Sequence, residues 1–188
     1  IYAGMGYGPY QFLLPWMNKR TDEYGGSLQN RVRLMREVVE EMKEAIGQTC
    51  AIAVRFSTDE LLKIPGDTLE SEAHDIISTL SDVPDLWDVK SSSWTRETAS
   101  ARFSEQGAQE PWSSFVKPLT SRPVVGVGRF TSPDEMVSQI KRGVLDLIGA
   151  ARPSIADPFL PRKIDEGRED EIRECIGCNI CVSSYHDG

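Results

Sequence analysis

Short, nearly continuous apolar runs alternate along the chain with longer segments in which apolar residues recur every three or four positions. The run Cys50–Phe56 is typical of a strand buried on both faces, with Arg55 at its C-terminal end. Before it, Leu28–Ile46 has the spacing of an amphipathic helix, with Ser27 as a suitable N-cap and Gly47 as a suitable end. This part of the chain therefore predicts a helix followed by a buried strand.

The same alternation repeats toward the C-terminus. Further strands are expected at Leu86–Lys90, Pro123–Arg129 and Asp146–Arg152. Further helices are expected near Ser71–Leu80, near Pro111–Leu119 and from Ser132 to Gly143. The last of these begins with an N-cap, a proline and acidic residues, which together are a strong helix start. Repeated strand and helix units of this kind predict an α/β fold with a parallel sheet.

Polar residues gather just after each expected strand, as they do in an eight-stranded β/α barrel (TIM barrel), whose active site lies at the C-terminal rim of the strands. Four strands make only half such a barrel and leave open sheet edges. We therefore expect residues 1–166 to be the C-terminal half of a TIM barrel and residues 167–188 the start of a cysteine loop. Ile1 is not a start residue, which agrees with a partial sequence. The alternative is a doubly wound open sheet, although no G-x-G-x-x-G follows an early strand.

Composition narrows the classes of function. With 188 residues and 39% hydrophobic content, the chain can bury one sizeable core. A net charge of −8 argues against nucleic acid and against an anionic membrane surface as partners. No apolar run approaches the length of a transmembrane helix, and no signal peptide is visible. Cys50 lies in an apolar run and is expected to be a reduced, buried thiol, which favours a cytoplasmic setting.

Three cysteines stand at equal spacing near the C-terminus, in the pattern C-x2-C-x2-C formed by Cys175, Cys178 and Cys181. This spacing brings three thiolates to one side of a short loop and is too crowded for a disulfide framework. It matches the opening of a four-cysteine iron–sulfur pattern, whose fourth ligand would lie beyond this sequence. Structural zinc and plain reduced thiols remain as alternatives.

Three features of the chain coincide. They are the run NKRTDEYGGSLQNR from Asn18 to Arg31, the strand ends Gly128-Arg129 and Arg152-Pro153, and the three-cysteine loop. Together they resemble the old yellow enzyme superfamily of flavin-dependent barrels. More narrowly, they resemble its iron–sulfur branch, which contains trimethylamine and dimethylamine dehydrogenases, dienoyl-CoA reductases and N-demethylases. The resemblance implies an FMN-binding barrel with a 4Fe-4S cluster.

The resemblance also implies which residues hold the flavin. Arg55 matches the arginine that faces the pyrimidine edge of the flavin, where a fixed guanidinium stabilises the negative charge of the reduced ring. The alternative for Arg55 is a structural ion pair at the barrel rim. Other positions match the phosphate-binding ends of strands seven and eight, where small residues and arginines admit a phosphate. These are Gly126, Gly128, Arg129, Ala151 and Arg152.

Catalytic and substrate-binding positions follow from the same resemblance. Tyr2 matches a tyrosine beside the flavin, which in trimethylamine dehydrogenase joins a histidine and an aspartate in a triad. The histidine position is Met5 here, and methionine cannot shuttle a proton. Trp94 matches an aromatic residue that holds the substrate ammonium by a cation–π contact, and Glu97 takes the place of the aspartate. The alternatives are a packed strand-end aromatic for Tyr2 and an ordinary loop for the other two.

The implied reaction is oxidative N-demethylation of a methylated amine. A hydride equivalent leaves the N-methyl group for flavin N5, and the resulting iminium hydrolyses to formaldehyde and the shorter amine. Electrons then pass to the cluster and on to an acceptor such as an electron-transfer flavoprotein, in a protein expected to be a homodimer. Because Met5 and Glu97 depart from the family pattern, we expect a larger substrate such as a methylated amino acid, with Arg96 contacting its carboxylate.

Two other functions stay open from the sequence. One is an NAD(P)H-dependent enoate or 2,4-dienoyl-CoA reductase of the same superfamily, which would reduce a C=C bond with a tyrosine as proton donor. The other is a zinc-stabilised α/β binding module without enzymatic activity.

Overall fold

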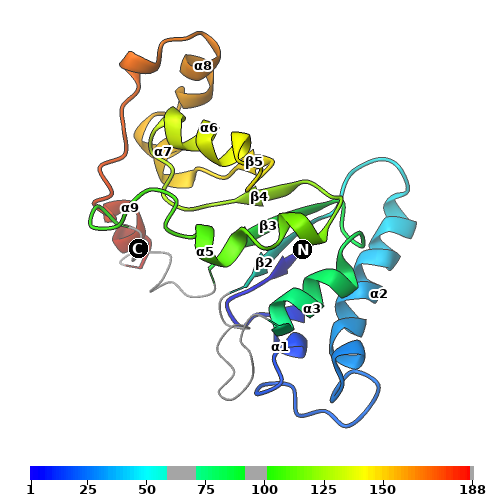
Figure 1. Cartoon of the computed structure of the whole chain (residues 1–188). Helices are drawn as coiled ribbons and strands as arrows, with labels where there is room; N and C mark the ends of the chain where they lie inside the picture. The colour runs from blue at the N-terminus through cyan, green and yellow to red at the C-terminus, as the bar shows by residue number, and fades with distance from the viewer. Residues whose placement is uncertain (59–70, 92–100, 187–188) are drawn as a thin grey trace.

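A single parallel sheet organises the computed structural model, which describes residues 1–58, 71–91 and 101–186 (Figure 1). The sheet contains five strands in the order of the sequence, and every neighbouring pair is parallel. The strands are β1 (Tyr2–Ala3), β2 (Ala53–Ser57), β3 (Leu86–Lys90), β4 (Val124–Gly126) and β5 (Leu147–Ile148). The prediction of an α/β fold with a parallel sheet is confirmed.

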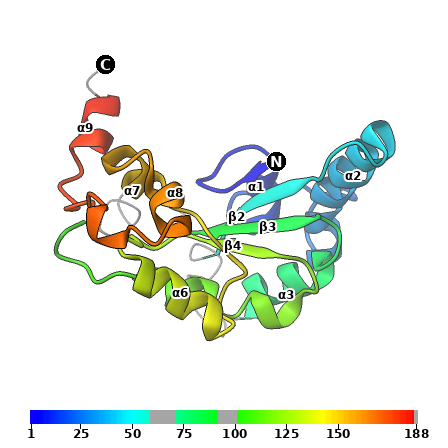
Figure 2. The same cartoon turned by 90° about the horizontal axis from the view of Figure 1, so that it is seen from above.

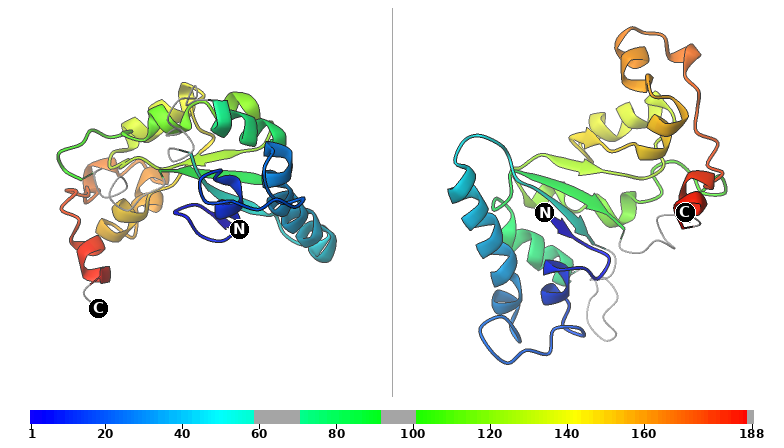
Figure 3. Two further views of the ribbon diagram at one scale, coloured as in Figure 1. Left: turned by 90° about the horizontal axis from the view of Figure 1, so that it is seen from below. Right: turned by 180° about the vertical axis from the view of Figure 1, so that it is seen from behind.

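The strand order separates the two architectures that the sequence left open. Each strand pairs with the next one in the chain, so every crossover advances in the same direction and places its helix on the same face. A doubly wound sheet instead reverses its strand order at a switch point. Figure 2 shows α3 (Ser71–Leu80) and α6 (Pro133–Lys141) on the same side of the strands, and Figure 3 shows β1 and β5 at opposite edges of the sheet. This is the winding of a β/α barrel.

The longest helix follows its sequence signals closely. Helix α2 spans Leu28–Ile46, and the Ser27 hydroxyl accepts a hydrogen bond from the Asn30 amide at 3.3 Å. Gly47 ends the helix with a φ of 57°, a conformation that favours glycine. The buried positions Val32, Met35 and Val39 face the core. The predicted start, end and apolar face of this helix are therefore confirmed.

The remaining helical segments are short. They are α1 (Pro9–Leu13), α5 (Glu110–Ser113), η1 (Lys117–Leu119), α7 (Ala151–Ala156), α8 (Leu160–Asp165), η2 (Glu169–Glu171) and α9 (Ile180–His186). The helix expected near Pro111–Leu119 is confirmed only in part, because the segment is divided into α5 and the 3₁₀ turn η1. Pro118 explains the division, since a proline has no N–H to continue an α-helical ladder. In the described part of the chain, no helix has the length and apolar character needed to cross a bilayer.

The predicted strand Asp146–Arg152 is also wrong in its second half. Only Leu147–Ile148 forms β5, and Arg152 lies in the first turn of α7. Pro153 is the physical reason, because proline cannot donate to a sheet and is well tolerated in the first turn of a helix.

Cys50 differs from the expectation of a buried thiol, because it is exposed. The strand that follows begins only at Ala53. Just before that strand, the Ile52 amide donates to a carboxylate oxygen of Asp85 at 2.9 Å. Strand β2 therefore begins three residues after Cys50, which lies in the preceding turn.

The two faces of the sheet differ in polarity. One row of in-register residues is partly exposed and includes charged side chains. It consists of Tyr2, Arg55, Asp88, Val125 and Leu147. The opposite face is apolar, and Phe56 makes edge-to-face contacts there with Tyr10 at 5.9 Å and Trp87 at 5.7 Å between ring centroids. The core therefore lies under the helices, and the polar face is the one that a closed barrel would turn inward.

The polar run from Asn18 to Arg31 builds a loop against this core. The Asn18 side-chain amide donates to the carbonyls of Phe12 and Tyr24, each at 2.7 Å. Arg31 is only 6% exposed; its Nε donates to the carbonyl of Leu13 at 3.0 Å, and its Nη2 forms an ion pair with Glu72. These side chains donate hydrogen bonds to backbone carbonyls that would otherwise lack a donor. The contacts of Asn18 and Arg31 therefore stabilise the fold of this loop.

We expect Arg31→Ala to lower the free energy of unfolding by about 3 kcal/mol, because the substitution leaves a partly buried carboxylate and the carbonyls of Leu13 and Gly26 without their donor. Denaturant titration of the protein would measure this. Arg33→Ala is the matched control on the same helix, since Arg33 donates only to an exposed carbonyl, that of Glu23, at 2.9 Å. Equal losses in the two variants would contradict a structural role for Arg31.

Candidate functional site

A pocket lies at the C-terminal ends of β4 and β5, where barrel enzymes place their active sites. Residues from four separate parts of the chain line it. They are Arg55, Gln109, the segment Val127–Phe130 and the segment Gly149–Pro153. The parallel strands bring these segments together because their carboxyl ends meet at one edge of the sheet.

Glycines allow the close packing beneath this pocket. A Cβ atom on Gly126 would lie 2.6 Å from the Leu145 side chain, and one on Gly149 would lie 2.7 Å from the Val127 side chain. Both distances are shorter than van der Waals contact, so a larger residue would force the strands apart. Gly149 lines the pocket, whereas Gly126 does not. Packing against Leu145 is thus sufficient reason for the glycine at position 126.

Arg129 is held in an unusual conformation at the pocket wall. Its φ is 59°, in the left-handed region that few non-glycine residues occupy. Its Nη1 donates to the carbonyl of Ser104, while its buried Nε has no hydrogen-bond partner among the described residues. Strained backbone and an unsatisfied buried donor each disfavour the fold by about 1–3 kcal/mol, and such features concentrate at binding sites.

The donor set fits a phosphate-bearing cofactor such as FMN. Arg129 and Arg152 both line the pocket, and their guanidinium groups can bind a phosphate through paired, charge-assisted hydrogen bonds. Gly128 and Ala151, also in the lining, carry little or no side chain and let a ligand approach the backbone. Of the positions expected at the phosphate, the structure gathers Gly128, Arg129, Ala151 and Arg152 around one pocket.

Arg55 makes the structural ion pair that the sequence left as one alternative, and its side chain also lines the pocket. Its Nη1 donates to Asp88 Oδ2 at 2.6 Å. The two residues are in-register neighbours on β2 and β3, so the sheet itself fixes the ion pair. The second carboxylate oxygen of Asp88 is buried without a hydrogen-bond partner. The guanidinium is therefore held at the pocket by a neighbouring strand.

Tyr2 lies on β1 beside Arg55, on the polar face of the sheet. Its ring centroid is 5.7 Å from the ammonium of Lys90, a residue that is only 3% exposed. Met5 occupies a left-handed turn after β1, with a φ of 55°. Neither Tyr2 nor Met5 lines the pocket that contains the three arginines. Both residues lie on or just after β1, the strand next to that of Arg55. Trp94, Glu97 and Arg96 lie outside the described residues.

Sequence reasoning missed two residues of this region. Gln109 lines the pocket, is 4% exposed, and its Oε1 accepts a hydrogen bond from the Ser91 amide at 2.9 Å. Nothing in its local sequence signals this position, because it sits in a long polar loop. The sequence does contain a signal for Lys90, because it is a charged residue at the C-terminal end of an apolar strand, as Arg55 is.

The cysteine loop lies against this pocket. Arg152 Nη1 donates to Asn179 Oδ1 at 2.7 Å, and the Arg102 amide donates to the Gly177 carbonyl at 3.0 Å. Cys175 is half-buried, Cys178 and Cys181 are exposed, and all three are free thiols. In the part of the chain that the structure describes, no three His, Cys, Asp or Glu side chains converge on one point where a single metal ion could bind.

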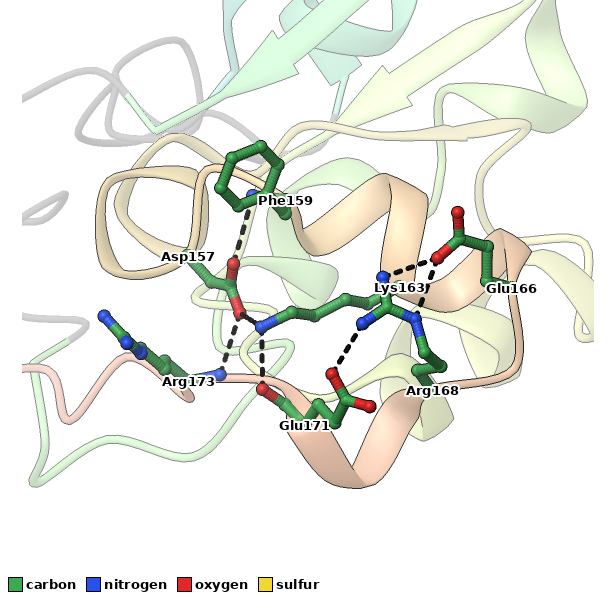
Figure 4. Close-up of polar contacts among 7 residues, drawn as sticks. All are labelled: Asp157, Phe159, Lys163, Glu166, Arg168, Glu171 and Arg173. Carbon is green, nitrogen blue, oxygen red and sulfur yellow. Dashed lines mark hydrogen bonds and ion pairs between the residues drawn. The ribbon is translucent and has the colours of Figure 1, made fainter.

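A buried ion pair anchors the segment that leads into this loop (Figure 4). Asp157 is 2% exposed, and its Oδ2 accepts from Lys163 Nζ at 2.6 Å and from the Arg173 amide at 2.9 Å. The hydrogen bond from Lys163 is the main cause that lowers the pKa of Asp157 to about 2, and the Arg173 amide adds to it. Further along, Thr131 Oγ1 donates to Glu174 at 2.5 Å. The charged segment 167–174 is therefore partly tied to the barrel.

Comparisons with known proteins agree with this site. The chain belongs to the NADH:flavin oxidoreductase / NADH oxidase family, whose sequence model matches residues 1–171. It is 44% identical to dimethylamine dehydrogenase from Hyphomicrobium sp. (strain x), in a match that covers 100% of this chain and 26% of that protein. The expected resemblance to the flavin-dependent oxidoreductases of this family is confirmed.

Solved structures give the same assignment. Histamine dehydrogenase from Rhizobium sp. 4-9 matches with a TM-score of 0.89 at 52% identity, over 96% of this chain and 26% of that one. A 6-hydroxypseudooxynicotine amine oxidase from Pseudomonas geniculata N1 matches with a TM-score of 0.86 at 55% identity, over 96% of this chain and 27% of that one. The chain thus spans about a quarter of the length of these relatives, and its fold is a segment of their TIM barrel.

The contacts of Asp157 with Lys163 and the Arg173 amide predict how the stability of the fold depends on acidic pH. The pKa of Asp157 is about 2 in the folded protein and 3.8 without these contacts, so its stabilisation is fully present above about pH 5 and is lost progressively as the pH falls toward 2. We expect the urea midpoint to fall less steeply between about pH 5 and pH 3 in Asp157→Asn than in the unmodified protein. Asp165→Asn, at an exposed position of α8, is the control and should keep the original slope. Parallel slopes for Asp157→Asn and the unmodified protein would refute the anchor.

Proposed function

We propose that the chain is the part of an FMN-dependent amine dehydrogenase that holds the phosphate and the pyrimidine edge of the flavin. The observation that carries this proposal is the convergence of Arg55, Arg129 and Arg152 on one pocket at the C-terminal rim of a barrel sheet. The names of three relatives support it, because two are amine dehydrogenases and the third is an amine oxidase. In this assignment residues 1–166 belong to the barrel and residues 167–188 begin the cysteine loop.

Each arginine has a distinct task. Arg129 and Arg152 bind the phosphate, which carries the charge that two guanidinium groups can share. Arg55 stands on another strand, and its fixed positive charge stabilises negative charge that develops on the ring of the bound cofactor. Asp88 orients this guanidinium and offsets part of its charge. When bound, FMN supplies the acceptor for the hydride equivalent that leaves the carbon next to the substrate nitrogen.

The substrate that we propose is an N-methylated amine larger than trimethylamine, such as a methylated amino acid. Loss of the hydride equivalent leaves an iminium ion, to which water adds to give formaldehyde and the shorter amine. Met5 supports a departure from the trimethylamine pattern, because its thioether cannot take part in proton transfer. Tyr2 is 39% exposed on the polar face and is the described side chain best placed beside the substrate, with Trp94 and Glu97 as further proposed contacts.

We also propose that Cys175, Cys178 and Cys181 ligate a 4Fe-4S cluster, with a fourth ligand beyond this sequence. Three free thiols at C-x2-C-x2-C spacing support this, since thiolates are the usual ligands of such clusters. The contact between the loop and Arg152 supports electron transfer from flavin to cluster. An electron-transfer flavoprotein as acceptor and a homodimer are part of the same proposal. Zinc in place of iron and sulfide in the purified full-length protein would argue against it.

Flavin binding gives a direct test of the pocket. Arg129→Gln in the full-length protein should weaken FMN binding by about 10- to 100-fold, because a hydrogen bond to a charged group is lost from the phosphate. Quenching of FMN fluorescence on titration with flavin-free protein would measure the dissociation constant. Arg162→Gln, at an exposed position on α8, is the control that should bind FMN normally. An unchanged affinity in Arg129→Gln would show that the pocket is not the phosphate site.

Anaerobic reduction of the flavin tests the reaction class. N-methylated amino acids should bleach the flavin absorbance of the full-length protein faster than trimethylamine does. Formaldehyde should appear in equal amount to the amine consumed. If NADPH reduces the flavin rapidly while no amine does so, the protein is a reductase of the same family and the amine proposal fails.

A further inference from the structure

One arginine of the pocket is shared with the cysteine loop. Arg152 lines the pocket and also donates from Nη1 to the side-chain oxygen of Asn179 at 2.7 Å. Asn179 stands between Cys178 and Ile180, directly before helix α9. A guanidinium has five donors in a planar fork, so the hydrogen bond to Asn179 uses only one of them.

A second contact places the backbone of the loop against Arg129. Gly177 is buried, and a Cβ atom on it would lie 2.7 Å from the Arg102 amide nitrogen and 3.1 Å from Arg129 Nε. A side chain at this position would push the loop away from the arginine. Both arginines of the proposed phosphate site are thus in contact with the segment between Cys175 and Cys181.

The backbone of this segment depends on such contacts. Gly177 and Asn179 both have positive φ values, of 65° and 60°. Glycine adopts this region freely, while asparagine tolerates it at some energetic cost. The surroundings must therefore hold Asn179 in place, and its hydrogen bond with Arg152 contributes to this.

The chemistry of the asparagine matters as much as its position. Its amide oxygen is a neutral acceptor, so it orients the guanidinium without removing its positive charge. An aspartate at the same position would form an ion pair and compete with a phosphate for the same donors. The side chain present is therefore the one that serves the loop and the phosphate site together.

We propose that Asn179 is a positioning residue that couples the cysteine loop to the FMN phosphate site through Arg152. This inference rests on the proposed function. A phosphate bound in the pocket fixes the guanidinium, and the fixed guanidinium holds the loop around Cys178. Because such coupling is reciprocal, a loop released from Arg152 weakens FMN binding by the factor by which FMN steadies the loop.

The test uses the full-length protein with FMN removed and then restored, and it reads two quantities. The first is the dissociation constant of FMN, and the second is the rate at which a chelator removes iron. In the unmodified protein, removing FMN should speed iron loss several-fold. In Asn179→Ala, FMN should bind about three- to tenfold more weakly, and the rate of iron loss should be fast with or without FMN.

Asn179→Asp separates positioning from a general structural effect. The new carboxylate should keep the loop attached to Arg152, so iron loss stays slow without FMN, while FMN binding weakens more than in Asn179→Ala. If iron loss in Asn179→Ala still responds to FMN as in the unmodified protein, the coupling is refuted. If the unmodified protein binds no FMN or no iron, the proposed function itself fails, and this result is distinct from the previous one.

Discussion

The parallel register of consecutive strands is the constraint on which the site depends. Arg55, Arg129 and Arg152 are far apart in the chain, and none of them is placed by its immediate neighbours in sequence. They meet because β2, β4 and β5 run in the same direction and their carboxyl ends share one edge of the sheet. A change in the direction of any one of these strands would move its arginine to the opposite end. The pocket is thus a consequence of topology before it is a consequence of side-chain chemistry.

Gathering three positive charges at one rim is unfavourable without compensation, and the chain compensates each charge differently. Arg55 pairs with a carboxylate on the next strand, Arg129 donates to a backbone carbonyl, and Arg152 donates to a neutral amide. Only the first of these acceptors carries a formal charge. The carboxylate of Asp88 therefore offsets part of the charge of Arg55, whereas the carbonyl and the amide orient Arg129 and Arg152 without adding a negative charge. This gradation suits a dianionic phosphate at one end and a ring that gains charge only on reduction at the other.

Local signals in the sequence predicted the elements whose boundaries depend on local chemistry. Leu86–Lys90 is a strand as expected, and Ser27 and Gly47 bound α2 because capping is decided within one turn. The apolar run Leu147–Ala151 contains no such signal, so the sequence pattern predicts a strand that continues into residues that form a helix. The Arg55–Asp88 pair and the role of Gln109 depend on strand register and on a loop that returns from far away in the chain. Residues whose partners are distant in sequence leave no local pattern, and this is why the site was predicted only where a family resemblance supplied it.

The polar run from Asn18 to Arg31 is the most distinctive part of the sequence, and its contacts stabilise the fold. Asn179 is inconspicuous in the sequence, yet it is the residue proposed to couple the cysteine loop to the FMN phosphate site. Asn18 and Arg31 satisfy backbone carbonyls and a partly buried carboxylate, so their identity follows from the folding of one loop. Asn179, by contrast, is one polar residue between two cysteines, and its contact with Arg152 becomes visible only when α7 and the loop are placed in space. If the cluster and the flavin exchange electrons, their relative position must survive motion of the loop. A hydrogen bond from the phosphate-binding arginine ties that position to occupancy of the cofactor site, because the group that recognises the cofactor is also the group that holds the loop.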